Sequence, residues 1–297
     1  MTPARLESFL AIVDTGSARA AARRLHVTES AVSASLASLH RELGVSLFER
    51  RGRGLQLTDA GELFAEYARK ILGLLEEGVA AARQGSCAHA GRLRLGAVTM
   101  AGEYLVPGLL AGFRGLQPDV DITLEVGHRE QTLARLADHH LDVVIAGRPL
   151  PGRGLVTRGT RTNSLVVVAA PGVHLDLDVA PWLLREPGSG TRATTLALID
   201  DLGIAPPTLA LGSHGAVIAS TVLGLGVTVA STDAVARHVS AGELEHRASP
   251  GTPLRRPWHI LTTGSPTATT RLFIQHLTSE KAGALRFRPG AGRARRG

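Results

Sequence analysis

The segment from Thr28 to Gly61 constrains the fold of this chain more than any other, and it reads TESAVSASLASLHRELGVSLFERRGRGLQLTDAG. Its apolar residues recur at helical spacing, which predicts an amphipathic helix with the stripe Val32, Leu36, Leu39 and Leu43. The Thr28 hydroxyl can cap the start of this helix, and Gly44 is suited to end it. An Arg- and Gly-rich turn then lies between two short apolar runs. The segment therefore predicts a helix followed by a basic β-hairpin.

The opposite face of this helix is small and polar, and a narrow helix face of that kind fits a DNA major groove. The candidate DNA contacts on it are Thr28, Glu29, Ser30, Ser33, Ala34 and Ser35. Further candidates are the arginines placed to meet phosphates or a minor groove, which are Arg23, Arg50, Arg51 and Arg53. Two alternatives stay open: the serines are plain helix surface, or the hairpin is exposed without touching DNA.

Two shorter helices are expected before this segment. The first has the apolar stripe Leu6, Phe9, Leu10 and Val13 and ends at Gly16. Ser17 can cap the second helix, whose alanines permit close packing against the helix that follows. Three short helices and a hairpin within residues 1–58 are typical of a small DNA-binding domain.

Residues 4–61 resemble the N-terminal winged helix-turn-helix domain of LysR-type transcriptional regulators. The resemblance rests on RLESFLAIVDTGS, ARAAARRLHVTESAVSASLASLHRELGVSLFER and RGRGLQLTDAG, in that order and spacing. It implies that the helix beginning near Thr28 is the recognition helix. Relatives commonly carry amide or basic residues where this chain has Glu29, Ala34 and Ser35. A glutamate can accept from a cytosine amino group and an alanine can contact a thymine methyl, so the base preference is expected to differ.

A linker helix is expected at residues 59–87, capped by Thr58. Its wide apolar seam includes Leu63, Tyr67, Ile71 and Leu74. Such a seam over a long helix favours coiled-coil-like pairing with a second chain, although packing on its own domain is the alternative. The resemblance implies an antiparallel pairing and a homodimer or homotetramer. The single Cys87 follows this helix; a redox role is the alternative to an inert thiol.

Residues 88–280 alternate between strand and helix patterns, which predicts a parallel α/β sheet with ligands at the carboxyl ends of its strands. Strands are expected at 93–97, 120–126, 141–146, 164–169, 182–185, 208–211, 227–230 and 258–261. The region resembles the two-lobed effector-binding domain of the same family, which is related to solute-binding proteins. The resemblance places the crossings between lobes near 161–165 and 261–265. Lobe one is then 91–162 plus 265–280, and lobe two is 163–263.

Candidate effector contacts lie where strands end and helices begin. Free N–H groups and the Thr99 hydroxyl make an anion site there, and the Arg185–Arg192 segment repeats this arrangement in the second lobe. The candidates are Thr99, Met100, Ala101, Gly102, His128, Gly147, Arg148, Ser189, Thr191, Arg192 and His214. The alternatives are that the small-residue turn only caps a helix, and that the histidines are ordinary surface or hydrogen-bonding residues.

The net charge of +7 comes mostly from the C-terminal end. Residues 281–297 contain six Lys or Arg and no acid, so a basic disordered tail is expected there. Whether this tail is merely solvated or touches DNA stays open. The chain shows neither a run of 18 apolar residues nor a leader peptide, and has one cysteine. These features favour a cytoplasmic protein without a membrane partner.

Together, these observations predict a DNA-binding transcriptional regulator. It is expected to bind double-stranded promoter DNA as an oligomer and to respond to a small anionic inducer between the lobes. Within the family, the chain resembles the branch that includes regulators of carbon fixation and of sulfur assimilation. The segments that carry this resemblance are GEYLVPGLLAGFRGLQPDVDITLEVGHRE and LDVVIAGRP. Contact with RNA polymerase stays open. The alternative is a cytosolic small-molecule-binding protein or an enzyme that uses the cleft, but no catalytic set, cofactor motif or metal-ligand spacing is apparent.

Overall fold

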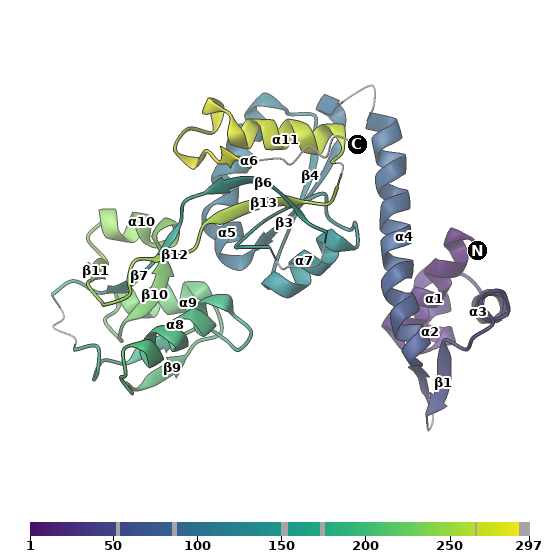
Figure 1. Ribbon diagram of the computed structural model, residues 1–297, viewed down its shortest axis with the longest axis horizontal. Helices are drawn as coiled ribbons and strands as arrows, with labels where there is room; N and C mark the ends of the chain where they lie inside the picture. Colours follow the sequence, from purple (N-terminus) through teal and green to yellow (C-terminus); the bar gives the residue numbers. More distant parts are fainter. Residues whose placement is uncertain (52–53, 85–87, 150–153, 173–175, 265, 291–297) are drawn as a thin grey trace. The chain divides into compact units, whose positions relative to one another are not determined.

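The computed structural model describes residues 1–51, 54–84, 88–149, 154–172, 176–264 and 266–290 (Figure 1). The chain divides into two units, and each is described by itself. The first consists of four helices and a two-stranded hairpin: α1 (Pro3–Thr15), α2 (Ala18–Leu25), α3 (Glu29–Leu43), β1 (Phe48–Arg51), β2 (Gly54–Leu57) and α4 (Asp59–Gln84). This is the predicted helix-turn-helix with a wing and a long helix.

The short helices begin and end where the sequence predicts. The Ser17 hydroxyl accepts from the Ala20 N–H at 3.2 Å, and Thr28 caps α3 by accepting from the Ala31 N–H at 3.2 Å. Gly16 and Gly44 end α1 and α3 with left-handed backbone, the conformation that glycine adopts without a steric cost. Local capping chemistry thus sets the lengths of these helices.

An aromatic cluster fastens the hairpin and α4 to the three-helix core. The ring of Phe9 packs against Phe48 at 5.4 Å and against Phe64 at 5.2 Å between centroids. Val32 and Leu39 are fully buried, which confirms that the apolar stripe of α3 faces inward. The outer face of α3 is therefore left to solvent.

The long helix α4 keeps most of its apolar seam outside the core. Ala65 and Ala68 are buried, whereas a second set of large apolar side chains on the same helix is exposed: Leu63, Tyr67, Ile71, Leu74, Leu75 and Val79. Leaving this much apolar surface in water is costly, and exposed apolar patches are typical of interaction surfaces. Cys87, which follows the helix, lies outside the described residues.

The second unit contains two lobes, each built on its own sheet (Figure 1). In lobe one the strand order is β14-β6-β13-β5-β3-β4. These strands are β3 (Arg92–Val98), β4 (Asp121–Gly127), β5 (Val143–Ala146), β6 (Val156–Arg161), β13 (Trp258–Thr262) and β14 (Arg288–Pro289). The helical segments of this lobe are η1 (Ala88–Ala90), α5 (Thr99–Tyr104), α6 (Val106–Leu116), α7 (Arg129–Ala137), α11 (Ala268–Thr278) and η2 (Glu280–Leu285).

Lobe two has a sheet in the order β10-β7-β11, with β12 also paired to β7, and a separate β8-β9 pair. Its strands are β7 (Ser164–Ala169), β8 (Trp182–Leu184), β9 (Thr208–Ala210), β10 (Thr228–Ser231), β11 (Glu245–Arg247) and β12 (Leu254–Arg255). Its helices are α8 (Gly190–Asp201), α9 (His214–Val222) and α10 (Thr232–Ser240).

The expectation of parallel sheets is only partly correct. The pairs β3-β4, β3-β5 and β8-β9 are parallel, whereas β13 pairs antiparallel with β5 and β6, and β7 pairs antiparallel with its neighbours. The reason is that β6 and β13 carry the chain out of lobe one and back, so they run in opposite directions. The edge strand β4 forms as predicted, but its Leu124 and Val126 are exposed.

The second crossing between lobes differs from the prediction. The first lies at residues 162–163, between β6 and β7, within the expected range. The second was expected near Leu261–Ser265, but β12 belongs to lobe two and β13 to lobe one, so the chain crosses at Arg256–Pro257. The range 163–263 for lobe two is therefore wrong at its end, because the apolar residues of 258–262 complete the sheet of lobe one.

The C-terminal segment also differs from the prediction of a disordered tail over 281–297. The Phe287 side chain is fully buried, Leu285 packs against the same core, and β14 pairs with β6. These two apolar residues anchor a segment whose charge pattern alone suggested disorder. Residues 291–297, which hold three arginines, lie outside the described part of the chain.

None of the described helices combines the length and apolarity that a membrane span requires.

Candidate DNA-reading surface and effector pocket

The DNA-reading surface predicted on α3 is open to solvent. Glu29, Ser30, Ser33 and Ala34 are exposed on one face, whereas Ser35 is only half-exposed. The turn between α2 and α3 spans three residues, as in helix-turn-helix proteins, where the second helix enters the major groove. The geometry of α3 thus agrees with a recognition helix, with Ser35 at its margin.

Some of the polar groups around this face already have partners within the protein, and others do not. The hydroxyl of Thr28 already accepts the capping bond from Ala31 and lies 3.0 Å from the Ser30 hydroxyl, so its first role is structural. Arg23 is exposed, while its neighbour Arg24 is paired with Asp14 at 2.9 Å. Arg23 is therefore better placed than Arg24 to meet a phosphate.

The predicted wing forms as the antiparallel pair β1-β2. Arg50 and Arg51 belong to β1, and Arg53 lies outside the described residues. Their contacts with DNA stay a prediction. Residues 1–58 contain eight arginines and five acidic residues, so this domain carries only a small positive excess.

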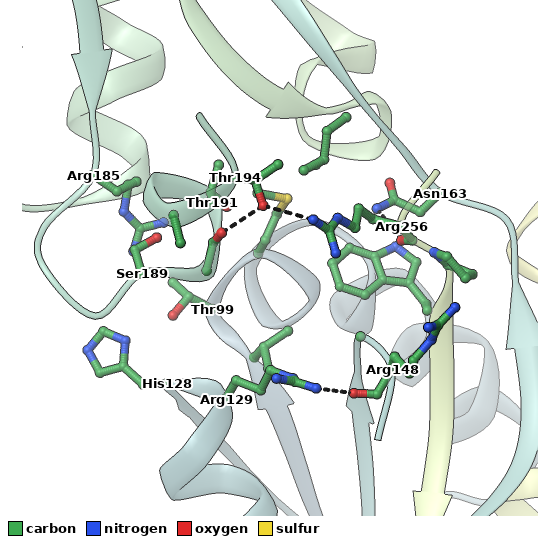
Figure 2. A pocket seen from close by; sticks show the side chains of 18 of the residues that line it. Thr99, His128, Arg129, Arg148, Asn163, Arg185, Ser189, Thr191, Thr194 and Arg256 are labelled. Atoms are coloured by element: carbon green, nitrogen blue, oxygen red, sulfur yellow. Dashed lines mark hydrogen bonds between the residues drawn. The ribbon is translucent and has the colours of Figure 1, made fainter. Parts of the chain in front are cut away.

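The candidate effector site is a cavity of about 550 Å³ between the two lobes of the second unit. Seven of the predicted contacts line it: Thr99, Met100, His128, Gly147, Arg148, Ser189 and Thr191. Figure 2 shows Thr99 close to Ser189 and Thr191, although these residues start helices of different lobes. The volume is suited to a small metabolite.

One side of this cavity presents hydroxyl groups and the start of a helix. Ser189 caps the twelve-residue helix α8 and is 8% exposed, and Thr191 lies in its first turn. The unpaired N–H groups there and the helix dipole favour a negative ligand group. Arg185 follows β8 on the same side, and its guanidinium is held by Glu186 at 2.6 Å. Hydrogen bonds from Arg185 lower the pKa of Glu186, which keeps this pair ionised.

The cavity is strongly cationic. Five arginines line it, namely Arg129, Arg148, Arg185, Arg255 and Arg256, and no Asp or Glu does so among the described residues. Within the same described ranges, only Arg185 of these five forms a salt bridge. Arg256 donates to the Thr194 hydroxyl at 3.5 Å, and Arg129 donates to the Arg148 carbonyl (Figure 2). Uncompensated guanidinium groups in a cavity are suited to phosphate or carboxylate.

Four of the predicted effector contacts do not line this cavity. Ala101 is fully buried, and Gly102 is also buried; a Cβ on Gly102 would lie 2.6 Å from Val126. Arg192 donates its guanidinium to the Arg185 carbonyl at 2.8 Å. These residues are therefore not part of the cavity lining. Helical periodicity turns Ala101 into the core and places Gly102 against Val126 of β4, and the Arg192 side chain folds back on its own turn.

His214 is the fourth residue outside the cavity lining. It is 1% exposed and packs edge-on against Tyr104 of the other lobe, with 5.3 Å between ring centroids. Neither ring nitrogen has a hydrogen-bond partner among the described groups. Burial, reinforced by the charge of Arg185, lowers the pKa of His214 to about 4. This histidine is therefore neutral near pH 7 and lies in the contact between lobes.

The pocket also contains residues that the sequence reasoning did not single out. They are mostly at or next to the crossings between lobes and include Arg129, Asn163, Arg255, Arg256 and Trp258. The Arg255-Arg256-Pro257 run was a usable signal, because two arginines next to a strand that returns to lobe one must lie near the cleft. It was missed because the second crossing was placed several residues too late.

In the described ranges, no group of three His, Cys, Asp or Glu side chains is arranged to hold a metal ion.

The geometry thus defines a two-part protein, with a winged helix-turn-helix unit and a two-lobed unit that encloses a cationic cavity. Residues 3–62 match the model of the bacterial regulatory helix-turn-helix protein, lysR family, and residues 88–282 match the LysR substrate binding domain. The chain belongs to the family of LysR-type transcriptional regulators. It is a DNA-binding regulator with an effector-binding domain.

Two named relatives and one solved structure illustrate the similarity. The HTH-type transcriptional regulator CfxR of Cupriavidus necator is 32% identical, covering 88% of this chain and 85% of that protein. The RuBisCO operon transcriptional regulator of Acidithiobacillus ferrooxidans is 32% identical, covering 94% of each. The regulatory domain of CcmR from Synechocystis PCC6803, solved in complex with 2-PG, is 26% identical, covers 62% of this chain and 94% of that domain, and has a TM-score of 0.56.

Proposed function

We propose that this regulator binds promoter DNA as a homodimer or homotetramer and changes transcription when a small phosphorylated acid enters the cavity between its lobes. The observation that carries the ligand class is the cavity itself, with five lining arginines and no lining acid in the described part of the chain. Such a site favours anionic metabolites over neutral and cationic ones, because its guanidinium groups attract negative charge and repel positive charge. The 2-PG complex of the related CcmR domain supports the same class.

The ligand has two anchoring regions on opposite lobes. Thr99 offers a hydroxyl from lobe one, while Ser189 and the start of α8 offer donors from lobe two. Arg148 and Arg256 bring cationic groups from lobe one and from the crossing segment, respectively. A ligand that bridges these groups stabilises one angle between the lobes, and a ligand shifts an equilibrium only through such differential contacts.

The exposed seam of α4 supports the oligomer. Pairing of two such helices buries Leu63, Tyr67, Ile71 and Leu74, and it brings two recognition helices onto one DNA molecule. The small charge excess of each DNA-binding domain makes this pairing important for affinity. The name of the Acidithiobacillus relative suggests genes of carbon assimilation as targets. The setting is the cytoplasm, where promoter DNA is accessible, and activation would further require contact with RNA polymerase.

The test measures DNA binding and ligand binding separately. Fluorescence anisotropy with the intergenic DNA next to the gene, across a range of salt concentrations, tests promoter binding. Calorimetry with 2-phosphoglycolate, and with glycolate as the matched compound without phosphate, tests the ligand class. We expect 2-phosphoglycolate to bind at least about tenfold more tightly than glycolate, since each charge-assisted contact contributes roughly 1.5–3 kcal/mol. Equal affinities would contradict the phosphorylated class, and no binding to any intergenic fragment at low salt would contradict the DNA role.

A further inference from the structure

The two segments that connect the lobes converge on the start of helix α10. The first leaves β6 after Arg161 and passes Asn163 into β7, and the second passes Arg256 and enters β13 at Trp258. Helix α10 belongs to lobe two and is capped by Ser231, with Asp233 in its first turn. Residues of both lobes and of both crossings therefore meet at one place.

One carboxylate links both crossing strands to this helix. Asp233 accepts two hydrogen bonds from the Arg161 guanidinium, at 2.6 and 2.9 Å, and a third from the Trp258 indole N–H at 2.9 Å. The side chains of Arg161 and Asp233 are 14% and 18% exposed, so water and salt screen this pair less than a surface pair. A bidentate charge-assisted pair also fixes geometry, because both hydrogen bonds require the same orientation.

A second set of hydrogen bonds ties the crossings to each other. The Asn163 side-chain amide donates to the Arg256 carbonyl at 2.9 Å, and the Arg256 N–H donates to the Asn163 carbonyl at 2.9 Å. The Ser231 hydroxyl donates to the Asn163 side-chain oxygen at 2.6 Å, and both residues are buried. We call these residues the hinge network: Arg161, Asn163, Ser231, Asp233, Arg256 and Trp258.

The hinge network reaches the effector cavity directly. Asn163, Arg256 and Trp258 all line the cavity, and Figure 2 shows Asn163 beside Arg256 at its edge. Asp233 and Arg161 do not line it. A ligand that packs on Trp258 therefore contacts a side chain that is hydrogen-bonded to Asp233. Asp233 also binds Arg161 at the end of the neighbouring strand β6.

We propose that Asp233 is a positioning residue that couples filling of the cavity to the angle between the lobes. It holds Trp258 in the cavity wall at one interlobe angle, so ligand contact with Trp258 stabilises that angle. This inference rests on the proposed ligand-binding function of the cavity. It predicts that Asp233 affects both ligand affinity and the response on DNA, although it contacts neither ligand nor DNA.

The first experiment needs no ligand. The chain has two tryptophans, Trp182 and Trp258, so protein labelled with 5-fluorotryptophan gives two ¹⁹F NMR signals, which Trp258→Phe assigns. We expect Asp233→Asn to shift or broaden the Trp258 signal and to leave Trp182 unchanged. Asp201→Asn, at the exposed end of α8, is the matched control and should move neither. An unchanged Trp258 signal in Asp233→Asn overturns the inference, whether or not any ligand binds.

The second experiment measures coupling with 2-phosphoglycolate as the probe. We expect Asp233→Asn to weaken probe binding by about tenfold, within the usual range of coupling between sites. DNA affinity without probe should stay within about twofold, while the probe-dependent change in the DNase I footprint is lost. A purely structural role would lower the thermal midpoint but preserve the footprint change, and that result would overturn the inference.

A double-mutant cycle identifies the route of the effect. If Asp233 acts through Trp258, the variant with both Asp233→Asn and Trp258→Phe binds the probe no more weakly than the worse single variant. Fully additive losses overturn the inference. Trp258→Phe removes the indole N–H and keeps an aromatic ring, so it also replaces Asp233→Asn if that variant does not fold. Wild-type protein that binds no probe would contradict the proposed ligand class, and the ligand-free NMR result would still decide on the role of Asp233.

Discussion

The DNA-reading surface and the effector pocket are built in opposite ways. The residues proposed to face DNA come from one contiguous stretch between Arg23 and Arg53, and the domain that carries them has only a small excess of positive charge. The pocket draws its five arginines from four separate places along the chain and has no lining acid among the described residues. We therefore propose that the two parts obtain their affinity differently. The DNA-binding domain would depend on dimerisation, whereas the pocket gathers its positive charge within one chain.

The largest effect is expected when dimerisation through α4 is prevented. Leu74→Asp places a charge in the exposed seam of α4. We expect DNA affinity to fall by about a hundredfold or more, since a monomer makes only half of the phosphate contacts of a dimer. Size-exclusion chromatography and fluorescence anisotropy measure assembly and binding. Glu66→Ala, exposed on the same helix, is the control. A dimeric Leu74→Asp protein with normal DNA affinity would break the comparison.

The second prediction concerns the neutral histidine between the lobes. Because burial lowers the pKa of His214 to about 4, the unfolded chain binds more protons than the folded protein between pH 4 and the ordinary value of 6.5. The free energy of unfolding therefore falls as the pH decreases through this window. We expect this group to account for roughly 3 kcal/mol of that loss.

Chemical denaturation at a series of pH values measures this effect. His214→Phe should keep the packing against Tyr104 and flatten the pH dependence, whereas the exposed control His246→Gln should not. His259 and His276 also have lowered pKa values caused by burial, so a smaller slope should remain in His214→Phe. An unaltered slope would mean that His214 is not the group responsible.

The third prediction tests the concentration of charge in the pocket. Arg148→Ala should weaken 2-phosphoglycolate binding by about tenfold to a hundredfold, because a charge-assisted contact contributes roughly 1.5–3 kcal/mol. Calorimetry measures the loss, and promoter binding without ligand should not change. Arg237→Ala removes an exposed arginine of the same unit outside the cavity and serves as the control. Equal effects of the two variants would show that net charge matters rather than the cavity.

The smallest predicted effect concerns phosphate contact by the DNA-binding domain. Arg23→Ala should weaken binding to all DNA sequences by a similar factor of about three to ten and reduce the slope against salt concentration by about one. Anisotropy at several salt concentrations gives both numbers. Arg24→Ala, whose side chain is already paired with Asp14, should have a smaller effect. A sequence-selective loss in Arg23→Ala would instead indicate base contact.

Sequence reasoning succeeded where structure is decided locally. Caps such as Ser17, Thr28 and Thr58, and the apolar stripe of α3, can be read directly because their partners lie within a few residues. The same reasoning selected seven residues that line the cavity, and their contact with an effector stays a prediction. It could not find Trp258 or Arg256, because their position depends on where the chain returns to lobe one, and the pairing of β13 between distant strands sets that point.

Sequence reasoning also cannot separate pocket residues from neighbours on the same helix start. Thr99 and Met100 line the cavity, whereas Ala101 lies in the core and Gly102 packs against Val126. The distinction depends on the rotation of a one-and-a-half-turn helix against Val126 of an adjacent strand. Likewise, the long-range hydrogen bonds of Asp233 join residues about 25 and 72 positions away, which no local pattern indicates.

The buried side chain of Phe287 has a practical consequence for anyone who trims or tags this protein. The match to the substrate-binding family ends at residue 282, yet Phe287 fills the core of lobe one and Gly290 donates its N–H to the Arg158 carbonyl at 2.7 Å. A chain shortened at the family boundary would leave a cavity where an aromatic ring belongs, and truncations of this size in a core usually cost about 3–5 kcal/mol. Expression variants should therefore end after residue 290, and an affinity tag belongs beyond that point.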